Sequence, residues 1–155
     1  MREYWHNPAA MQEKFSGEWC RTGDMGCRDA GGWIHFHGRG DDLIKTSGYR
    51  VGPAEVEASV MEVPGVAACA VIGVPDAERG EAIKAFIKVL PGHAPGEELA
   101  RRIQAHVKSR LAAHEYPREI EFLDEFPATV TGKVKRRELR EAELRKRQEQ
   151  SGDGR

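Results

Sequence analysis

A charged, glycine-rich segment at residues 38–57, GRGDDLIKTSGYRVGPAEVE, contains side chains that can bind anions. Arg39 offers a planar fork of donors that matches a phosphate or a carboxylate. Arg50 follows the Ser47–Gly48 turn, where glycine lets a ligand approach the backbone N–H groups closely. The segment therefore predicts an anion-binding surface, and an ordinary hairpin turn with solvated charges is the plain alternative.

Two single charged residues stand in other glycine-containing turns. Asp24 in RTGD can accept the two hydroxyls of a ribose, although a turn aspartate that bonds its own backbone is the simpler interpretation. Lys133 follows Gly132 in a Thr/Gly loop ahead of a basic helix, which makes it a movable point charge suited to a phosphate. The simpler interpretation of Lys133 is a solvated residue of that helix.

Composition restricts the class of protein. The 155 residues are 39% hydrophobic and 32% charged with a net charge of -1, which is typical of a globular chain without general attraction to nucleic acid or membranes. No apolar run approaches the ~18 to 20 residues that span a bilayer, and the first residues lack a signal-peptide core. We therefore predict a cytoplasmic protein with no membrane span. The basic excess of residues 133–147 lacks aromatic side chains for base stacking, so we expect no nucleic-acid partner.

Metal and disulfide sites have little support in the sequence. Cys20, Cys27 and Cys69 are an odd number of cysteines without paired spacing. Cys27 with His35 and His37 lacks a fourth ligand at a zinc-like spacing, and two histidines two residues apart are simply neighbours on one strand face. We predict no metal site in this chain.

Hydrophobic periodicity predicts the elements that must position the charged residues. Residues 1–37 are predicted to form short strands joined by turns, with too little apolar material for an independent core. Their apolar set is Trp5, Phe15, Trp19, Trp33 and Phe36.

From Leu43 onward the pattern predicts a complete α+β layer of helices on a small sheet. In one strand, Ile83, Ala85 and Ile87 face one way and Lys84 faces the other. We predict the fold class α+β, with a hairpin and a three-stranded sheet packed with helices, preceded by a short β-rich segment. The predicted elements are a hairpin at 43–51, a helix from Pro53, strands at 66–74 and 82–90, a helix at 99–111, a strand at 118–126, a terminal helix at 133–148 and a disordered tail at 151–155.

Four motifs in fixed order strongly resemble the C-terminal end of the AMP-forming acyl-CoA synthetases, which belong to the adenylate-forming enzyme superfamily. The motifs are EYWHNP, WCRTGD, GRGDDLIKTSGYRVGPAEVE and PATVTGKVKRRELR, and the resemblance covers residues 1 to about 141. The stretch EYPREIEFLDEFPATVTGK looks most similar to medium-chain and related bacterial acyl-CoA ligases. The resemblance implies that residues 1–40 end an N-terminal adenylation domain, 41–141 form a mobile C-terminal lid, and 142–155 are a charged helix end and a disordered tail.

The resemblance also implies roles in nucleotide chemistry. Asp24 corresponds to the residue that binds the ATP ribose, and Arg39 and Arg50 to nucleotide-contacting arginines. Asp41 corresponds to the hinge about which the lid rotates between an adenylating and a thioester-forming pose. Lys133 corresponds to the catalytic lysine, which stabilises charge as the acyl carboxylate attacks the α-phosphate.

Further residues correspond to the binding site for CoA. They are Ser47, Gly48, Tyr49, Arg79, Lys108, Tyr116 and Arg118. The implied reaction converts a carboxylate and ATP to acyl-AMP and pyrophosphate, and then transfers the acyl group to CoA. The implied cofactors are ATP or AMP, CoA and Mg²⁺, with the Mg²⁺ site in the N-terminal adenylation domain, which is also the expected partner.

Neither the phosphate-binding loop nor the acyl pocket of the family is present in the chain, so we expect it to be inactive alone and its acyl substrate to be undefined. Two other functions remain open. The chain can be the lid of an adenylation domain that loads a carrier-protein thiol, or a non-catalytic interaction module. A homo-oligomer also remains open.

Overall fold

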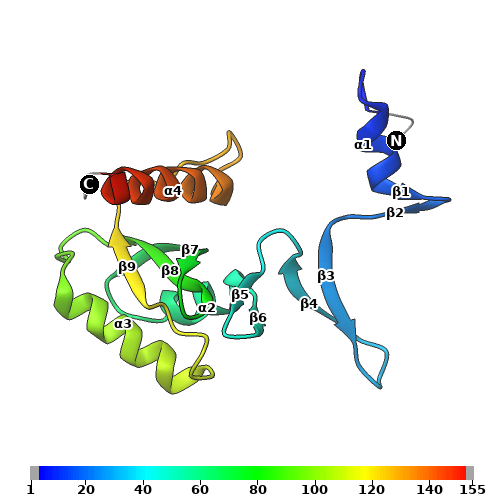
Figure 1. The fold of residues 1–155 in the computed structure, drawn as a ribbon. Coiled ribbons are helices and arrows are strands. Elements are labelled where there is room, and N and C mark those ends of the chain that lie inside the picture. The colour runs from blue at the N-terminus through cyan, green and yellow to red at the C-terminus, as the bar shows by residue number, and fades with distance from the viewer. Residues whose placement is uncertain (1–3, 153–155) are drawn as a thin grey trace. The chain divides into compact units, whose positions relative to one another are not determined.

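The computed structural model describes residues 4–152, and the chain divides into two compact units, Met1–Asp41 and Asp42–Arg155 (Figure 1). The sequence analysis places the domain boundary between residues 40 and 41. Which larger domains the units represent remains a proposal. Among residues 4–152, no helix is both long enough and apolar enough to cross a membrane.

The first unit consists of one short helix and two antiparallel strand pairs. Its elements are α1 (Pro8–Lys14), β1 (Phe15–Ser16), β2 (Trp19–Cys20), β3 (Asp24–Arg28) and β4 (Ile34–Arg39). The sequence analysis missed α1, although its start signal is present. The Asn7 side chain accepts a hydrogen bond from the Ala10 N–H at 3.1 Å, and Pro8 occupies the first helical position, where its missing N–H costs nothing.

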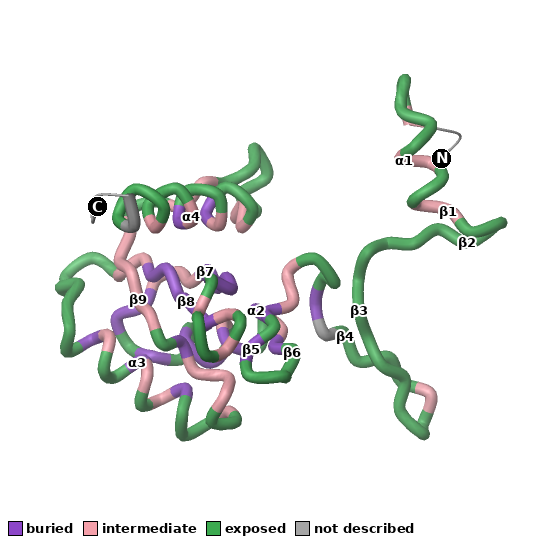
Figure 2. Tube along the Cα trace, viewed as in Figure 1, coloured by how far each residue is buried: buried purple, intermediate pink, exposed green. Residues whose placement is uncertain are grey.

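Large aromatic side chains of the first unit are exposed. Trp5, Trp19 and Trp33 are 85%, 81% and 75% exposed, and Figure 2 shows that most of this unit's described trace is exposed. A two-stranded pair forms a single layer, so the Trp19 ring on β2 gains little burial from its own pair. This agrees with the expectation that the segment has little core of its own.

The second unit has the predicted order of a hairpin followed by α-β-β-α-β-α, and the predicted α+β class is confirmed. Its elements are β5 (Ile44–Thr46), β6 (Tyr49–Val51), α2 (Pro53–Met61), β7 (Val66–Asp76), β8 (Gly80–Val89), α3 (Glu97–Arg110), β9 (Glu119–Phe122) and α4 (Arg136–Gly152). Helix α4 includes Ser151 and Gly152, so the expected disordered tail is wrong at these two residues. Residues 153–155 lie outside the described range.

The sheet of the second unit is larger than the sequence predicts. It has five strands in the order β6-β5-β8-β7, with β9 parallel to β8 on the same side as β5. The hairpin is not separate, because Thr46 pairs with Gly80 and the Ser47 N–H donates to the Arg79 carbonyl at 2.9 Å. This long-range pairing satisfies the free edge of β5, which a local sequence pattern cannot reveal.

The predicted hairpin turn is confirmed. Ser47 and Gly48 have φ angles of 50° and 84°, the left-handed conformation that a two-residue hairpin turn requires. Pro53 begins α2 as predicted, with Gly52 as the N-cap.

Both faces of the sheet are covered, which gives two separate cores (Figure 2). Helices α2 and α3 cover the face that carries Ile83 and Ile87, and α4 covers the face that carries Phe86. The predicted alternation in this strand is therefore correct. Lys84 nevertheless is only 5% exposed, because α4 covers its face of the sheet.

Candidate functional site

The candidate nucleotide-binding residues of the first unit surround one open concavity. Asp24 and Arg39 are cross-strand partners, and Arg39 Nη1 lies 3.6 Å from Asp24 Oδ1. Arg39 Nε also donates to Asp41 Oδ1 at 3.1 Å, so one guanidinium links both carboxylates. The concavity is lined by Glu13, Lys14, Arg21, Thr22, Gly23, Asp24, Met25, Arg39, Gly40 and Asp41.

The local backbone leaves the Asp24 carboxylate accessible. The backbone N–H of Asp24 donates to Thr22 Oγ1 at 3.1 Å, and the Asp24 side chain is 44% exposed. Gly23 has a φ of 86°, and a Cβ at this position would lie 2.9 Å from Arg39 Nη2. Glycine is therefore needed for the turn that presents Asp24 beside Arg39.

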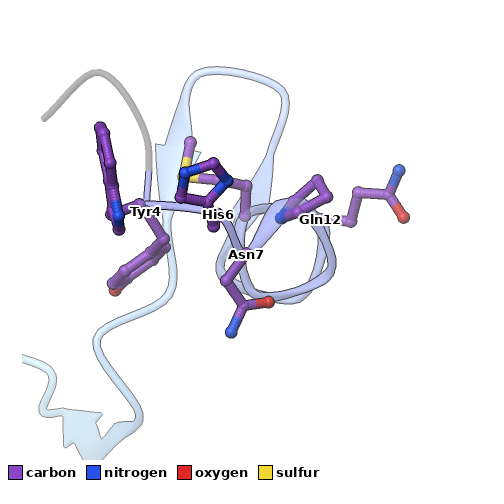
Figure 3. A pocket seen from close by; sticks show the side chains of 7 residues that line it. Tyr4, His6, Asn7 and Gln12 are labelled. Carbon is purple, nitrogen blue, oxygen red and sulfur yellow. The ribbon is translucent and has the colours of Figure 1, made fainter.

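A second concavity of the same unit has a different chemistry. It lies against α1, and Figure 3 shows Tyr4, His6, Asn7 and Gln12 around it. None of its lining residues is Lys, Arg, Asp or Glu, so it offers no fixed charge to a phosphate.

Lys133 stands at the end of a tight loop in the second unit. Its N–H donates to Thr129 Oγ1 at 3.0 Å, and its carbonyl accepts from the Thr129 N–H at 2.8 Å. Gly132 closes the turn with a φ of 81°. Lys133 is exposed and has no ion pair with any described residue. The sequence predicts that the terminal helix starts at residue 133, but α4 begins at Arg136. Lys133 therefore lies in the loop before the helix, and its charge is available to a ligand.

Three of the predicted CoA-binding residues come together beside α3. Lys108 Nζ lies 4.1 Å from the centroid of the Tyr116 ring, and the Arg118 guanidinium carbon lies 4.7 Å from it. Arg118 Nη1 also donates to the Tyr116 hydroxyl at 2.8 Å. Two cations on one aromatic ring form a site of positive potential that fits a phosphate.

Other predicted CoA-binding residues lie at the hairpin turn. Arg79 adjoins it through its carbonyl, but its guanidinium already lies 3.4 Å from Asp76 Oδ1 and 3.0 Å from Glu78 Oε2. The hydrogen bond from the Arg79 N–H, together with the Glu78 N–H and the guanidinium, holds the pKa of Asp76 below its usual range. The charge of Arg79 is thus largely neutralised, unlike that of Lys108. Arg50 lies on the adjoining strand β6, opposite Lys45, and is exposed.

His114 joins the hairpin turn to the group of cations around Tyr116, and the sequence analysis missed this residue. The rings of Tyr49 and His114 are stacked, with centroids 3.8 Å apart and planes 12° apart. The contact places the hairpin turn beside the loop that carries Tyr116. A histidine two residues before Tyr116 was the available signal, but no sequence pattern pairs it with Tyr49.

Comparison with known proteins identifies the family. Residues 55–133 match the family described as AMP-binding enzyme C-terminal domain. The chain belongs to this family. The match runs from the first turn of α2 to Lys133, so it includes the Lys108, Tyr116 and Arg118 group.

The AMP-binding C-terminal domain occurs in proteins much longer than this chain. The chain is 48% identical to the mitochondrial acyl-coenzyme A synthetase ACSM1 of Mus musculus over 92% of its own length and 25% of that protein. It is 48% identical to the acetyl-coenzyme A synthetase of Bacillus subtilis over 93% of its length and 25% of that protein. Among solved structures, the anthranilate CoA ligase AuaEII in complex with anthranoyl-AMP has a TM-score of 0.82 and 45% identity, over 90% of this chain and 27% of that one.

Proposed function

We propose that the chain is the C-terminal part of an ATP-dependent, AMP-forming acyl-CoA synthetase. The whole enzyme joins a carboxylate to ATP, giving acyl-AMP and pyrophosphate, and then transfers the acyl group to CoA. The observation that supports this most is the distribution of charge on the second unit. Lys133, which has no ion pair among residues 4–152, precedes α4 on one face of the sheet, and a second cationic group lies beside α3 on the other face.

In the first half-reaction, Lys133 approaches the α-phosphate and the attacking carboxylate. A cation aimed between two anions lowers the energy of a transition state in which their charges meet. Asp24 accepts the ribose hydroxyls, and Arg39 and Arg50 contact the nucleotide. Asp41 is the hinge, and it is the last residue of the first unit.

In the second half-reaction, the other face of the lid binds CoA. Lys108 and Arg118 hold its phosphates beside the Tyr116 ring, while Ser47, Gly48 and Tyr49 face the pantetheine arm. Arg79 contributes mainly by holding the hairpin turn, because its charge is shared with two carboxylates. We assign the Mg²⁺ site to the N-terminal adenylation domain, as the resemblance to the family implies.

A lid that loads a carrier-protein thiol is the second candidate. Lys108 and Arg118 favour free CoA, because a carrier protein presents its pantetheine arm without the nucleotide phosphates that these cations would bind. Competition between CoA and a phosphopantetheinylated carrier protein in the thioester step distinguishes the two. Fatty acid metabolism and a cytoplasmic location remain predictions from the sequence.

A chimera tests the proposed function. It consists of the Bacillus subtilis acetyl-coenzyme A synthetase with its C-terminal quarter replaced by this chain. With acetate, ATP, Mg²⁺ and CoA, we expect the chimera to release pyrophosphate and form acetyl-CoA, while the 155-residue chain alone does neither. The truncated relative without this chain is the control. A folded chimera that releases no more pyrophosphate than the truncated relative would contradict the proposal.

The Tyr49–His114 stack gives a specific prediction for the CoA step. Replacing His114 by alanine removes the ring that holds Tyr49, so we expect the KM for CoA in the chimera to rise roughly 3- to 10-fold, as an aromatic pair is worth about 0.5–1.5 kcal/mol. His114→Phe keeps a stacking ring and should restore the KM. Steady-state kinetics with CoA as the varied substrate measure this. Equal effects of alanine and phenylalanine would show that the stack has no part in CoA binding.

A further inference from the structure

A partly buried ion cluster anchors the start of α4. Arg136, the first residue of this helix, forms a fork on Glu57 of α2, with Nη2 2.6 Å from Oε2 and 2.8 Å from Oε1. Arg136 Nε also donates to Glu57 Oε1 at 3.1 Å. The side chains are 27% and 15% exposed, so this charge-assisted pair is screened less by water than a surface pair.

Glu57 is itself held in place. Its Oε1 accepts a hydrogen bond from the Val71 N–H at 2.8 Å, so the carboxylate ties α2 to strand β7. Glu57 therefore joins Arg136 to both a core helix and the sheet of the second unit.

The anchor lies next to the Lys133 loop. Arg136 follows Lys133 by three residues, which span at most ~11 Å of extended chain. At the base of the loop, the Lys135 N–H donates to the Pro127 carbonyl at 2.8 Å, and Ala128 pairs with Val134. These local bonds set the shape of the loop, while the Arg136 fork sets where the loop sits on the domain.

The same arginine reaches the chain that follows the unit boundary. Arg136 Nη1 lies 3.7 Å from Asp42 Oδ2, and Asp42 is the first residue of the second unit, directly after Asp41. The catalytic loop is thus tied to the segment that leaves the proposed hinge. A change in the direction of that segment would therefore alter the contact between Asp42 and Arg136, which anchors the loop.

We propose that Arg136, held by Glu57 and Asp42, is a positioning residue for adenylation, which fixes the Lys133 loop relative to the sheet. The inference depends on the proposed role of Lys133. Arg136 does not touch substrate in this assignment, and acts only through the loop.

Arg137 provides a matched control. It is the next residue of α4 and also pairs with a glutamate, Glu141, at 2.8 Å. The Arg137 side chain is 90% exposed, and its partner is one turn away on the same helix, so the pair joins α4 to no other element. Arg137→Gln removes the same charge without removing an anchor.

The first test uses the 155-residue chain and does not depend on catalysis. Backbone ¹⁵N order parameters report whether residues 129–133 are rigid. We expect them to fall from about 0.85 to below about 0.6 in Arg136→Gln and to stay unchanged in Arg137→Gln. Unchanged loop order parameters in a folded Arg136→Gln variant would overturn the proposal. Should that variant fail to fold, Arg136→Lys keeps the charge but loses the fork, and the same comparison applies.

The second test measures the two half-reactions in the chimera. We expect Arg136→Gln to lower kcat for acyl-AMP formation about tenfold, with KM for ATP little changed, and to spare transfer from supplied acyl-AMP to CoA. A tenfold change is within the range measured for misplaced catalytic groups. Glu57→Gln should have the same effect, and the double variant should be no slower than either single one, because both remove one interaction.

Further outcomes separate this inference from the proposed function. Equal slowing of both half-reactions by a folded Arg136→Gln variant would overturn the positioning role, because the anchor would then not act through the Lys133 loop. Normal adenylation in Arg136→Gln beside slow adenylation in Lys133→Ala would overturn only the anchor. Normal adenylation in Lys133→Ala would overturn the proposed role of Lys133, whereas a folded chimera without pyrophosphate release would overturn the proposed function itself.

Discussion

Replacing Lys133 by alanine in the chimera is expected to slow acyl-AMP formation by roughly 10²- to 10³-fold, the scale for losing one charge-stabilising group in a transition state. Transfer of the acyl group from supplied acyl-AMP to CoA should remain nearly intact. The reason is that the Lys133 ammonium is exposed and has no partner among residues 4–152, so its charge does not serve the fold.

The separation of the two effects follows from the two faces of the sheet. Val134, next to Lys133, packs against the core under α4, whereas Tyr116 packs against the core under α2 and α3. One rigid domain cannot easily present opposite faces to a single reaction centre at once. A rotation about Asp41 would present them in turn.

The measurement is pyrophosphate release for the first half-reaction and thioester formation from supplied acyl-AMP for the second. Lys108→Ala is the reciprocal control, because it removes a cation from the other face. It should raise the KM for CoA about tenfold, the scale of one charge-assisted hydrogen bond, and leave adenylation unchanged. Equal slowing of both steps by Lys133→Ala would instead make Lys133 a structural charge, and the alternating lid would be wrong.

The elements of the second unit could be predicted because their signals are local. Pro53 begins a helix, Ser47 and Gly48 make a hairpin turn, and the alternation around Lys84 gives a strand, all within a few residues of sequence. Helix α1 also has a local signal, the Asn7 cap before Pro8, but the sequence analysis predicts only strands and turns in residues 1–37.

The features that could not be predicted join residues far apart in the chain. The pairing of Thr46 with Gly80 makes the hairpin part of the sheet, and the stack of Tyr49 on His114 joins two loops. No periodicity within either segment encodes such a contact. Residue type and turn context alone singled out charged residues such as Lys133, and the resemblance to a family added the CoA-binding residues. The structure adds that Lys108 and Tyr116 lie together, which their separation in sequence does not show.

Burial of Lys84 is a further long-range feature, since it depends on where α4 packs. Its Nζ lies 2.8 Å from Glu143 of α4 and 2.7 Å from Glu121 of β9. The side chains of Lys84 and Glu143 are 6% and 5% exposed. Burial acts to raise the pKa of Glu143, but hydrogen bonds from Lys84 and Arg147 outweigh it and hold the pKa below its usual value of 4.5.

Replacing Lys84 by methionine is therefore expected to lower the free energy of unfolding by about 3 kcal/mol at neutral pH. Loss of one partner of a buried pair costs about 3–5 kcal/mol, and the lower end applies because Arg147 still bonds Glu143. Urea unfolding of the 155-residue chain measures the loss. The exposed pair of Arg101 and Glu97 is the control, and Arg101→Ala should cost less than about 1 kcal/mol.

The pH dependence of this loss follows from the lowered pKa of Glu143. A carboxyl group with a lowered folded-state pKa stabilises the fold above its unfolded pKa, and this contribution disappears as the pH falls through the folded-state value. The difference between the wild type and Lys84→Met should therefore be largest at neutral pH and shrink below about pH 4.5. Exchanging Glu143 for leucine together with Lys84→Met removes the unpaired charge, and it should recover much of the lost stability. A double variant as unstable as Lys84→Met would show that the ammonium stabilises the fold by packing rather than by pairing with Glu143.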